Sequence, residues 1–330
     1  MPPSSNAYTL VTIFGGSGFL GRHVVRALAR RDFRIRVAVR RPDLAGHLQP
    51  LGRVGQIEAV QANVRFPDSV DGAVRGSDIV INLVGILFQS GRQRFKSVQF
   101  QGAETIARAT AQHGARLIHV SAIGANRTSW SGYARSKARA ERAVLRAVPT
   151  ATIFRPSIVF GPEDHFFNRF AALACLLPAL PLIGAGRTRF QPVFAGDVAE
   201  AIAAAVEGKT KPGAIYELGG PEIFSFKALM QFILATIERR RLLVPIPFWI
   251  ARLQALFLQF LPNPPLTPDQ VTLLKRDNIV SDEAKREGRT LEGLDIIARS
   301  VPVIVPSYLW RFRKTGQYRQ RNIPAPHSQP

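Results

Sequence analysis

A glycine-rich turn carries the clearest chemical signal in the sequence. It includes Gly15, Gly18 and Gly21, and it joins a predicted buried strand at 10–14 to a predicted helix at 21–30. Gly15 permits a tight turn, Gly18 lets the backbone approach a pyrophosphate, and Gly21 allows close packing of helix on strand. The helix N-terminus offers unpaired N–H groups and partial positive charge to the phosphates. We therefore predict a dinucleotide site, although an ordinary strand-to-helix turn could share the pattern. Further contacts are expected from Ser17, Phe19 and Leu20.

Two arginines follow the second predicted strand, at 34–39, and bear on the choice of dinucleotide. An NAD site usually places Asp or Glu there to accept a hydrogen bond from the ribose 2′-hydroxyl. This chain has Arg40 and Arg41 instead, and its next acid is Asp43. Guanidinium groups pair well with a 2′-phosphate. The pattern favours NADPH (NADP) over NADH, against the alternative that both arginines are only solvated.

Tyr133 and Lys137 stand four residues apart in a predicted helix at 133–147. Residues at this spacing share one face of a helix, so both side chains can point into the same cleft. A phenol and an amine placed together can hold a cofactor or take part in proton transfer.

The elements around these residues alternate regularly between strand and helix. The alternation predicts an α/β fold, a Rossmann-type doubly wound parallel sheet followed by a smaller C-terminal α/β lobe. We expect a dinucleotide-binding domain at 1–160 as the core of a larger fold at 1–230, a lobe at 161–306 and a basic, disordered tail at 307–330. Further strands are predicted at 56–60, 79–84, 115–120, 151–154 and 214–218, and helices at 95–112 and 226–239.

These motifs together resemble the extended and atypical short-chain dehydrogenases/reductases. The resemblance covers about residues 8–230 and includes the turn, the Tyr133–Lys137 pair and Arg155-Pro156-Ser157-Ile158 after the sixth predicted strand. It implies that Asn63 and Val64 contact adenine. It also implies that the cofactor is lined by Leu83, Val84, Gly85, Pro156 and Ile158.

The same resemblance implies catalytic roles and shows where they are weakened. In active members the lysine lowers the tyrosine pKa and binds the nicotinamide ribose, and the tyrosine exchanges a proton with the substrate. The usual Ser or Thr corresponds to Ser121, yet the best register places Ala122 there. The usual Asn is replaced by Gln99 or Gln101. Catalysis and a purely structural hold on the cofactor therefore both remain open.

One branch of this family is especially similar, the nucleotide-binding accessory subunits of respiratory complex I and their bacterial relatives. Its most discriminating match is the segment 264–278, which lies outside the generic fold. The resemblance implies a tightly held NADPH and complex I subunits, or another membrane-associated assembly, as partners. The alternative is an NADPH-dependent reductase or epimerase, acting on a quinone or isoprenoid intermediate.

Composition limits the remaining classes. The 330 residues are 46% hydrophobic and 20% charged, which is typical of a globular protein, and the single cysteine, Cys175, excludes an internal disulfide. The net charge of +21 implies an anionic partner. We find no nucleic-acid module, so we expect no nucleic acid and favour a membrane surface or large assembly. The histidines lack metal spacing, and no metal site is expected.

The C-terminal third suggests how a membrane could be contacted. We expect neither a signal peptide nor a transmembrane helix, but an amphipathic helix near 245–261 rich in Trp, Phe and Leu. Tyr308 and Trp310 precede a run of basic residues. Apolar area and positive charge together predict peripheral attachment to an anionic membrane surface, at the cytoplasmic face of a bacterial inner membrane. The alternative is that this helix packs against its own lobe.

Overall fold

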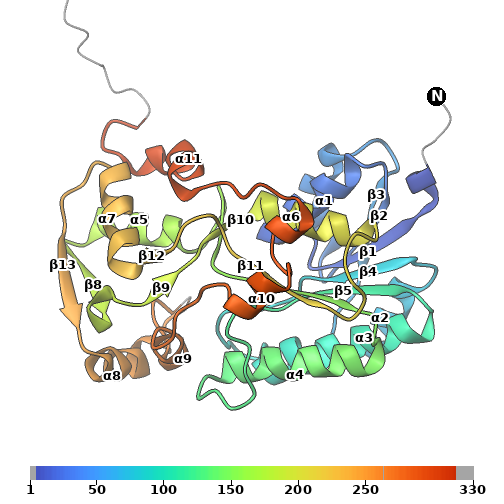
Figure 1. The fold of residues 1–330 in the computed structure, drawn as a ribbon, viewed down its shortest axis with the longest axis horizontal. Coiled ribbons are helices and arrows are strands. Elements are labelled where there is room, and N and C mark those ends of the chain that lie inside the picture. The colour runs from blue at the N-terminus through green and yellow to red at the C-terminus, as the bar shows by residue number, and fades with distance from the viewer. Residues whose placement is uncertain (1–4, 263, 317–330) are drawn as a thin grey trace, which may run out of the picture.

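The computed structural model describes residues 5–262 and 264–316. Within them, seven parallel strands form one sheet in the order β11-β6-β5-β4-β1-β2-β3 (Figure 1). This is the predicted Rossmann-type α/β fold, and the strand boundaries agree with the prediction to within a few residues. The strands are β1 (Leu10–Phe14), β2 (Arg34–Val39), β3 (Ile57–Gln61), β4 (Ile79–Asn82), β5 (Arg116–Val120), β6 (Thr152–Pro156) and β11 (Ile215–Leu218).

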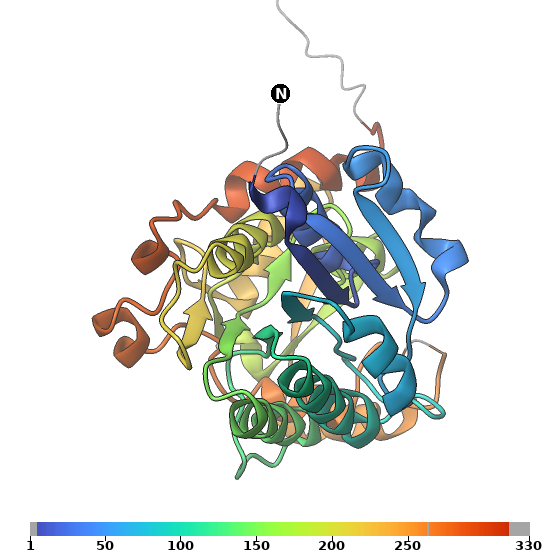
Figure 2. The same cartoon turned by 90° about the vertical axis from the view of Figure 1, so that its right-hand side faces the viewer.

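Helices cover both faces of the sheet, as the apolar central strands require. One layer contains α1 (Phe19–Ala29) and α6 (Ala195–Val206), which pack on each other. The other contains α2 (Pro67–Val74), α3 (Gly102–Gln112) and α4 (Gly132–Ala147), with α3 and α4 side by side (Figure 2). A π-helical turn, Phe95–Gln101, leads into α3. Since α6 and β11 come from beyond residue 160, the sheet and its helices extend past the expected end of the first domain.

The smaller lobe lies beside the carboxyl ends of the strands and has a separate core around Phe160, Phe167 and Phe226. Its main helices are α5 (Phe167–Leu176) and α7 (Phe226–Thr236), and β8 (Ala179–Ile183) pairs in parallel with β13 (Leu242–Ile246). The lobe also contains two short strand pairs. In these, β7 (Val159–Phe160) pairs with β10 (Val193–Phe194), and β9 (Arg189–Phe190) pairs with β12 (Phe224–Ser225). The lobe is therefore α/β, as predicted.

The chain beyond β13 forms short helices that return across the molecule. These are α8 (Phe248–Leu258), α9 (Pro268–Leu273), α10 (Asp282–Arg286), α11 (Val301–Ile304) and α12 (Pro306–Leu309). Short 3₁₀ segments lie at Ser5–Tyr8, Pro42–Leu51, Gly184–Gly186, Glu292–Leu294 and Trp310–Phe312.

Two expectations for this region need correction. The amphipathic helix begins at Phe248, because Pro245 belongs to β13 and Pro247 precedes the first helical turn. The expected tail is packed at its start: Tyr308 is buried and donates a hydrogen bond of 2.6 Å to Asp164 Oδ2. Tyr308 therefore belongs to the lobe core and is not a membrane anchor. The rest of the expected tail, 317–330, lies outside the described residues.

Among the described residues, no helix combines the length and the apolar character needed to span a bilayer.

Candidate nucleotide-binding site

The glycine turn has the geometry that the sequence predicts. Gly15 has φ +81°, a conformation that favours glycine. A Cβ on Gly21 would lie 2.4 Å from the carbonyl oxygens of Gly15 and Gly16, so only glycine fits there. Gly18 is the N-cap of α1, and the first turn of α1 carries no acidic residue. The N-terminus of α1, with Ser17, Phe19 and Leu20 beside it, is open to an anion.

The two arginines after β2 differ in their surroundings. Both are exposed, but Arg41 forms a 2.6 Å ion pair with Asp43 whereas Arg40 has no ion pair with a described residue. Asp43 is thus held by Arg41. Arg22, another basic residue near the turn, is paired with Glu163 of the lobe. Arg40 is the side chain most available to an anion at the end of β2.

The remaining predicted cofactor contacts follow successive strands at the same edge of the sheet. Asn63 follows β3, and its Oδ1 accepts a hydrogen bond from the backbone N–H of Arg65. Val64 packs against Gly102, where a Cβ would approach it to 2.8 Å. After β4, Leu83 N donates to Phe14 O, and Asn82 Oδ1 accepts from Val84 N. These hydrogen bonds fix the loop that carries Leu83, Val84 and Gly85.

Lys137 lies next to this loop, deep in the protein. Its Nζ donates to the carbonyl of Val120 at 3.2 Å, and a Cβ on Gly85 would lie 3.4 Å from the same nitrogen. Burial lowers the pKa of Lys137 to about 8, although Glu141 acts in the opposite direction. The amine is held between β5 and the loop after β4.

Tyr133 is on the same face of α4, and its ring stacks edge-on against Phe95 with centroids 5.8 Å apart. Lys137 Nζ lies 6.0 Å from the centre of the Tyr133 ring. Burial raises the pKa of Tyr133 to about 12, and the negative charge of Asp269 adds to the effect. This shift is opposite to the one that proton exchange near neutral pH requires.

Near the same site, Ser121 and His119 carry buried polar atoms that form no hydrogen bond within residues 5–262 and 264–316. Ser121 directly follows β5 and is buried, and its Oγ has no hydrogen bond to a described residue. Both ring nitrogens of His119 are also buried, with no partner in the described part of the chain, and burial beside Lys137 lowers the His119 pKa to about 3. Buried polar groups normally have partners, so these atoms favour a polar group bound there. Together with the glycine turn, they fit a dinucleotide.

Of the two glutamines expected in place of the usual family Asn, Gln99 is buried beside α4 whereas Gln101 is exposed. Gln99 is buried in the π-helical turn; its Oε1 accepts from Ser136 Oγ at 2.6 Å, and its Nε2 donates to Ile86 O at 2.8 Å. These bonds tie α4 to the loop after β4. Irregular helical turns of this kind often occur at functional sites.

The backbone around Pro156 and Ile158 is contacted by a C-terminal segment for which sequence analysis predicts no role in the site. Pro156 O accepts a hydrogen bond from Ile123 N. Ser157, which lies between Pro156 and Ile158, donates its hydroxyl to Asn278 Oδ1 at 2.6 Å.

The carboxylate of Asp269 accepts hydrogen bonds at the start of α4. They come from Ser131 Oγ at 2.8 Å, from Gly132 N at 2.6 Å and from Tyr133 N at 3.4 Å. Asp269 and Asn278 both belong to 264–278. That segment resembled one family branch, but nothing in the sequence indicated that it contacts α4.

Comparisons with known proteins agree with this geometry. The model of the NAD dependent epimerase/dehydratase family matches residues 11–219. The mitochondrial NADH dehydrogenase (ubiquinone) 1 alpha subcomplex subunit 9 of Arabidopsis thaliana is 35% identical, over 95% of this chain and 80% of its own. The ceramide reductase of Caulobacter vibrioides is 37% identical over 54% of this chain and 56% of its own.

A solved structure shows the same fold. It is dTDP-glucose 4,6-dehydratase from Streptomyces venezuelae with NAD and TYD bound, 19% identical, covering 92% of this chain and 96% of its own with a TM-score of 0.66. The family match covers more than half of the chain and includes the glycine turn, the loop after β4 and the Tyr133–Lys137 pair. The chain therefore belongs to the NAD-dependent epimerase/dehydratase family of extended short-chain dehydrogenases/reductases.

Proposed function

We propose that this chain is an NADPH-binding accessory protein of respiratory NADH:ubiquinone oxidoreductase, in which the nucleotide has a structural role. In this proposal the protein is peripheral to the membrane, at the cytoplasmic face of a bacterial inner membrane. The proposed partner is supported by the similarity to the NADH dehydrogenase subunit of Arabidopsis thaliana. That match covers 95% of this chain, so it extends through α8 and α9.

The proposed way of binding the nucleotide, and the choice of NADPH, rest on individual residues of this chain. Gly15, Gly18 and the N-terminus of α1 would receive the pyrophosphate, and Asn63 and Val64 would contact adenine. Arg40 would neutralise part of a 2′-phosphate, because its guanidinium is exposed and not in an ion pair with a described residue. Leu83, Val84, Gly85, Pro156 and Ile158 would line the nicotinamide half, with Lys137 beside its ribose.

The observation that carries the structural role is the position of Asp269 at the start of α4. Its carboxylate caps the helix that holds Tyr133, and its charge opposes deprotonation of the phenol. Lys137, which would favour the phenolate, donates instead to Val120 O. Tyr133 and Lys137 therefore suit a hold on the cofactor better than proton transfer.

Peripheral attachment is assigned to α8. The helix packs on its neighbours through its small residues Ala251 and Ala255, which are fully buried. Phe248 packs on the same small core, but other large residues of the helix face outward: Trp249 is 70% exposed and Phe257 72%. Exposed clusters of this kind mark membrane or protein contacts. Further exposed apolar side chains nearby are Leu253, Leu256, Phe260 and Leu261.

A second candidate function is an NADPH-dependent reductase or epimerase, in quinone or isoprenoid metabolism. It is favoured by the retained Tyr133–Lys137 pair and by the similarity to a ceramide reductase. In that case a bound nucleotide would supply the hydride, Tyr133 would donate the proton, and Ser121 Oγ would hold the substrate oxygen.

The accessory role is tested in a host that lacks its own copy of the protein. Membranes solubilised in mild detergent are separated on a native gel, and the chain is located by antibody against the NADH-oxidising band. We expect wild type to co-migrate with that band, and a variant carrying W249S and F257S to be lost from it while remaining folded. A wild-type chain found only as a free protein, with normal complex I activity in its absence, contradicts the assignment.

A further inference from the structure

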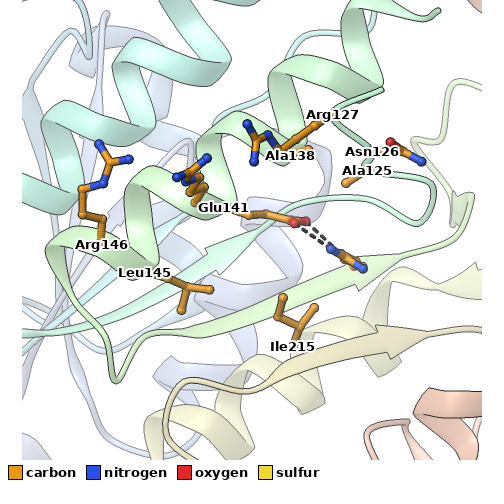
Figure 3. A pocket seen from close by; sticks show the side chains of 10 residues that line it. Ala125, Asn126, Arg127, Ala138, Glu141, Leu145, Arg146 and Ile215 are labelled. Carbon is orange, nitrogen blue, oxygen red and sulfur yellow. Dashed lines mark hydrogen bonds and ion pairs between the residues drawn. The ribbon is translucent and has the colours of Figure 1, made fainter. Parts of the chain in front are cut away.

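An open groove lies beside α4, on the side away from α3. Its lining residues belong neither to the proposed nucleotide site nor to the proposed membrane contact. Its volume is about 670 Å³, and it is lined by α4, β6, β11 and the loop at 125–127 (Figure 3). The helices of this layer lie in the order α2, α3, α4 across the sheet. The groove runs along α4 beside β6 and β11, the last two strands at that edge of the sheet. It lies where a further helix of that layer would pack.

The floor of the groove is partly apolar and also contains a partly buried ion pair. Leu145 of α4 and Ile215 of β11 are half-buried there. Between them, Arg155 donates to both carboxylate oxygens of Glu141, at 2.9 and 2.7 Å, and also reaches Glu217 at 3.4 Å. The charge of Arg155 is therefore compensated within the protein.

The rim is positively charged and uncompensated. Arg127, Arg142 and Arg146 are exposed, line the groove, and have no hydrogen bond or ion pair from their side chains to a described residue. Arg142 and Arg146 are one helical turn apart, on the same face of α4, about 6 Å along its axis. Arg139, one turn earlier, extends the same stripe.

We propose that this groove binds an acidic amphipathic helix of a partner protein, which completes the helical layer beside α4. Carboxylates one turn apart on that helix would pair with Arg142 and Arg146, and its apolar side chains would cover Leu145 and Ile215. A second copy of this chain does not fit, because its own α4 would bring like charges together. A flat bilayer cannot reach the floor of a concave groove.

The probe is a stapled helical peptide of about 15 residues with Glu one turn apart on one face and Leu on the adjacent face. Its binding to the full chain, with nucleotide present, is followed by fluorescence anisotropy at physiological salt. The groove variant is R127Q/R142Q/R146Q. The matched control, R26Q/R30Q/R34Q, removes the same charge from exposed arginines on α1 and around β2.

We expect the groove variant to weaken peptide binding at least about tenfold and the control less than about twofold. A charge-swapped pair, R142E/R146E with a peptide carrying Lys in place of Glu, should restore binding. Thermal stability and nucleotide content should stay unchanged in all variants, which separates this proposal from the assigned function.

Three results with the peptide and the variants overturn the proposal. They are no binding of the peptide to the wild type, equal losses in the groove and control variants, and equally tight binding of a peptide with Gln in place of Glu. Tripolyphosphate or phosphatidylglycerol vesicles are also tested in place of the peptide. If they bind the groove and the peptide does not, the groove is a phosphate site and the proposal is also overturned.

Discussion

The carboxylate of Asp269 accepts a 2.6 Å hydrogen bond from the backbone N–H of Gly132, the first residue of the helix that carries Tyr133 and Lys137. A negative charge at a helix N-terminus is stabilising, because it satisfies unpaired N–H groups and complements the helix dipole. The same charge lies close enough to Tyr133 to raise its pKa. The C-terminal segment thus supports the nucleotide site and restrains the chemistry of its tyrosine.

Replacing Asp269 tests this double role. D269N should lower the Tyr133 pKa from about 12 while burial still keeps it above 10. It should also reduce the free energy of unfolding by about 1–3 kcal/mol, since the carboxylate bonds are charge-assisted. The tyrosine pKa is measured by NMR of ¹³C-labelled tyrosine, with Y133F to assign the resonance. D282N, at an exposed carboxylate of α10, is the control and should change neither quantity. An unchanged Tyr133 pKa in D269N would refute the coupling.

The glycines of the turn should differ in what they tolerate. A Cβ on Gly21 meets two backbone oxygens at 2.4 Å, whereas the nearest atom to a Cβ on Gly18 is Gly15 O at 3.3 Å. We expect Gly21→Ala to destabilise the fold itself, by several kcal/mol. Gly18→Val should fold yet lose the nucleotide, because its side chain would occupy the pyrophosphate position. Calorimetric melting with and without added NADPH distinguishes the two. Gly18→Val protein that is still stabilised by NADPH would show that the phosphates lie elsewhere.

Arg40 should determine the preference for NADPH. Its guanidinium is not in an ion pair with a described residue while Arg41 is paired with Asp43, so R40A should weaken NADPH binding more than R41A. A lost charge-assisted contact costs about 1.5–3 kcal/mol, roughly ten- to a hundredfold in Kd. NADH affinity, measured by the same calorimetric titration, should hardly change. Equal losses for both nucleotides, or tighter binding of NADH by the wild type, would contradict the assignment.

The buried Lys137 should make stability depend on pH. Burial lowers its pKa from 10.5 to about 8, so the unfolded chain binds the proton more tightly than the folded one between these values. The stability of the nucleotide-free protein should therefore rise as the pH increases from 8 towards 10, by at most about 3 kcal/mol. Denaturant unfolding at each pH measures this. In K137M the rise should be smaller, and the same rise in both proteins would mean that other groups cause it.

The sequence could predict where candidate site residues lie along the chain, at strand ends and on one face of a helix. Their positions depend on the order of strands and helices along the chain and on the helical repeat of side chains, which a sequence displays directly. These residues are the glycine turn, Arg40 after β2, the loop after β4 and the Tyr133–Lys137 pair. The boundaries of α8 were less accurate, because Pro245 is compatible with both an edge strand and a helix start.

Contacts between distant segments could not be predicted in this way. Asp269 is separated from Gly132 by more than a hundred residues, and Tyr308 from Asp164 likewise, and no periodicity connects either pair. The run of basic residues after Tyr308 predicts a tail, whereas the tertiary fold buries the Tyr308 ring and satisfies its hydroxyl. Such residues gain their roles only from packing.

The most direct test of the structural role is the fate of the nucleotide bound to the purified protein. The chain is isolated without added cofactor, the bound nucleotide is identified after denaturation, and exchange is followed with isotopically labelled NADPH. We expect NADPH that co-purifies, exchanges over hours or longer, and is not oxidised when ketone or quinone substrates are added. A protein that exchanges nucleotide within seconds and oxidises it with such a substrate, in a manner abolished by Y133F, would contradict a structural role and establish a reductase.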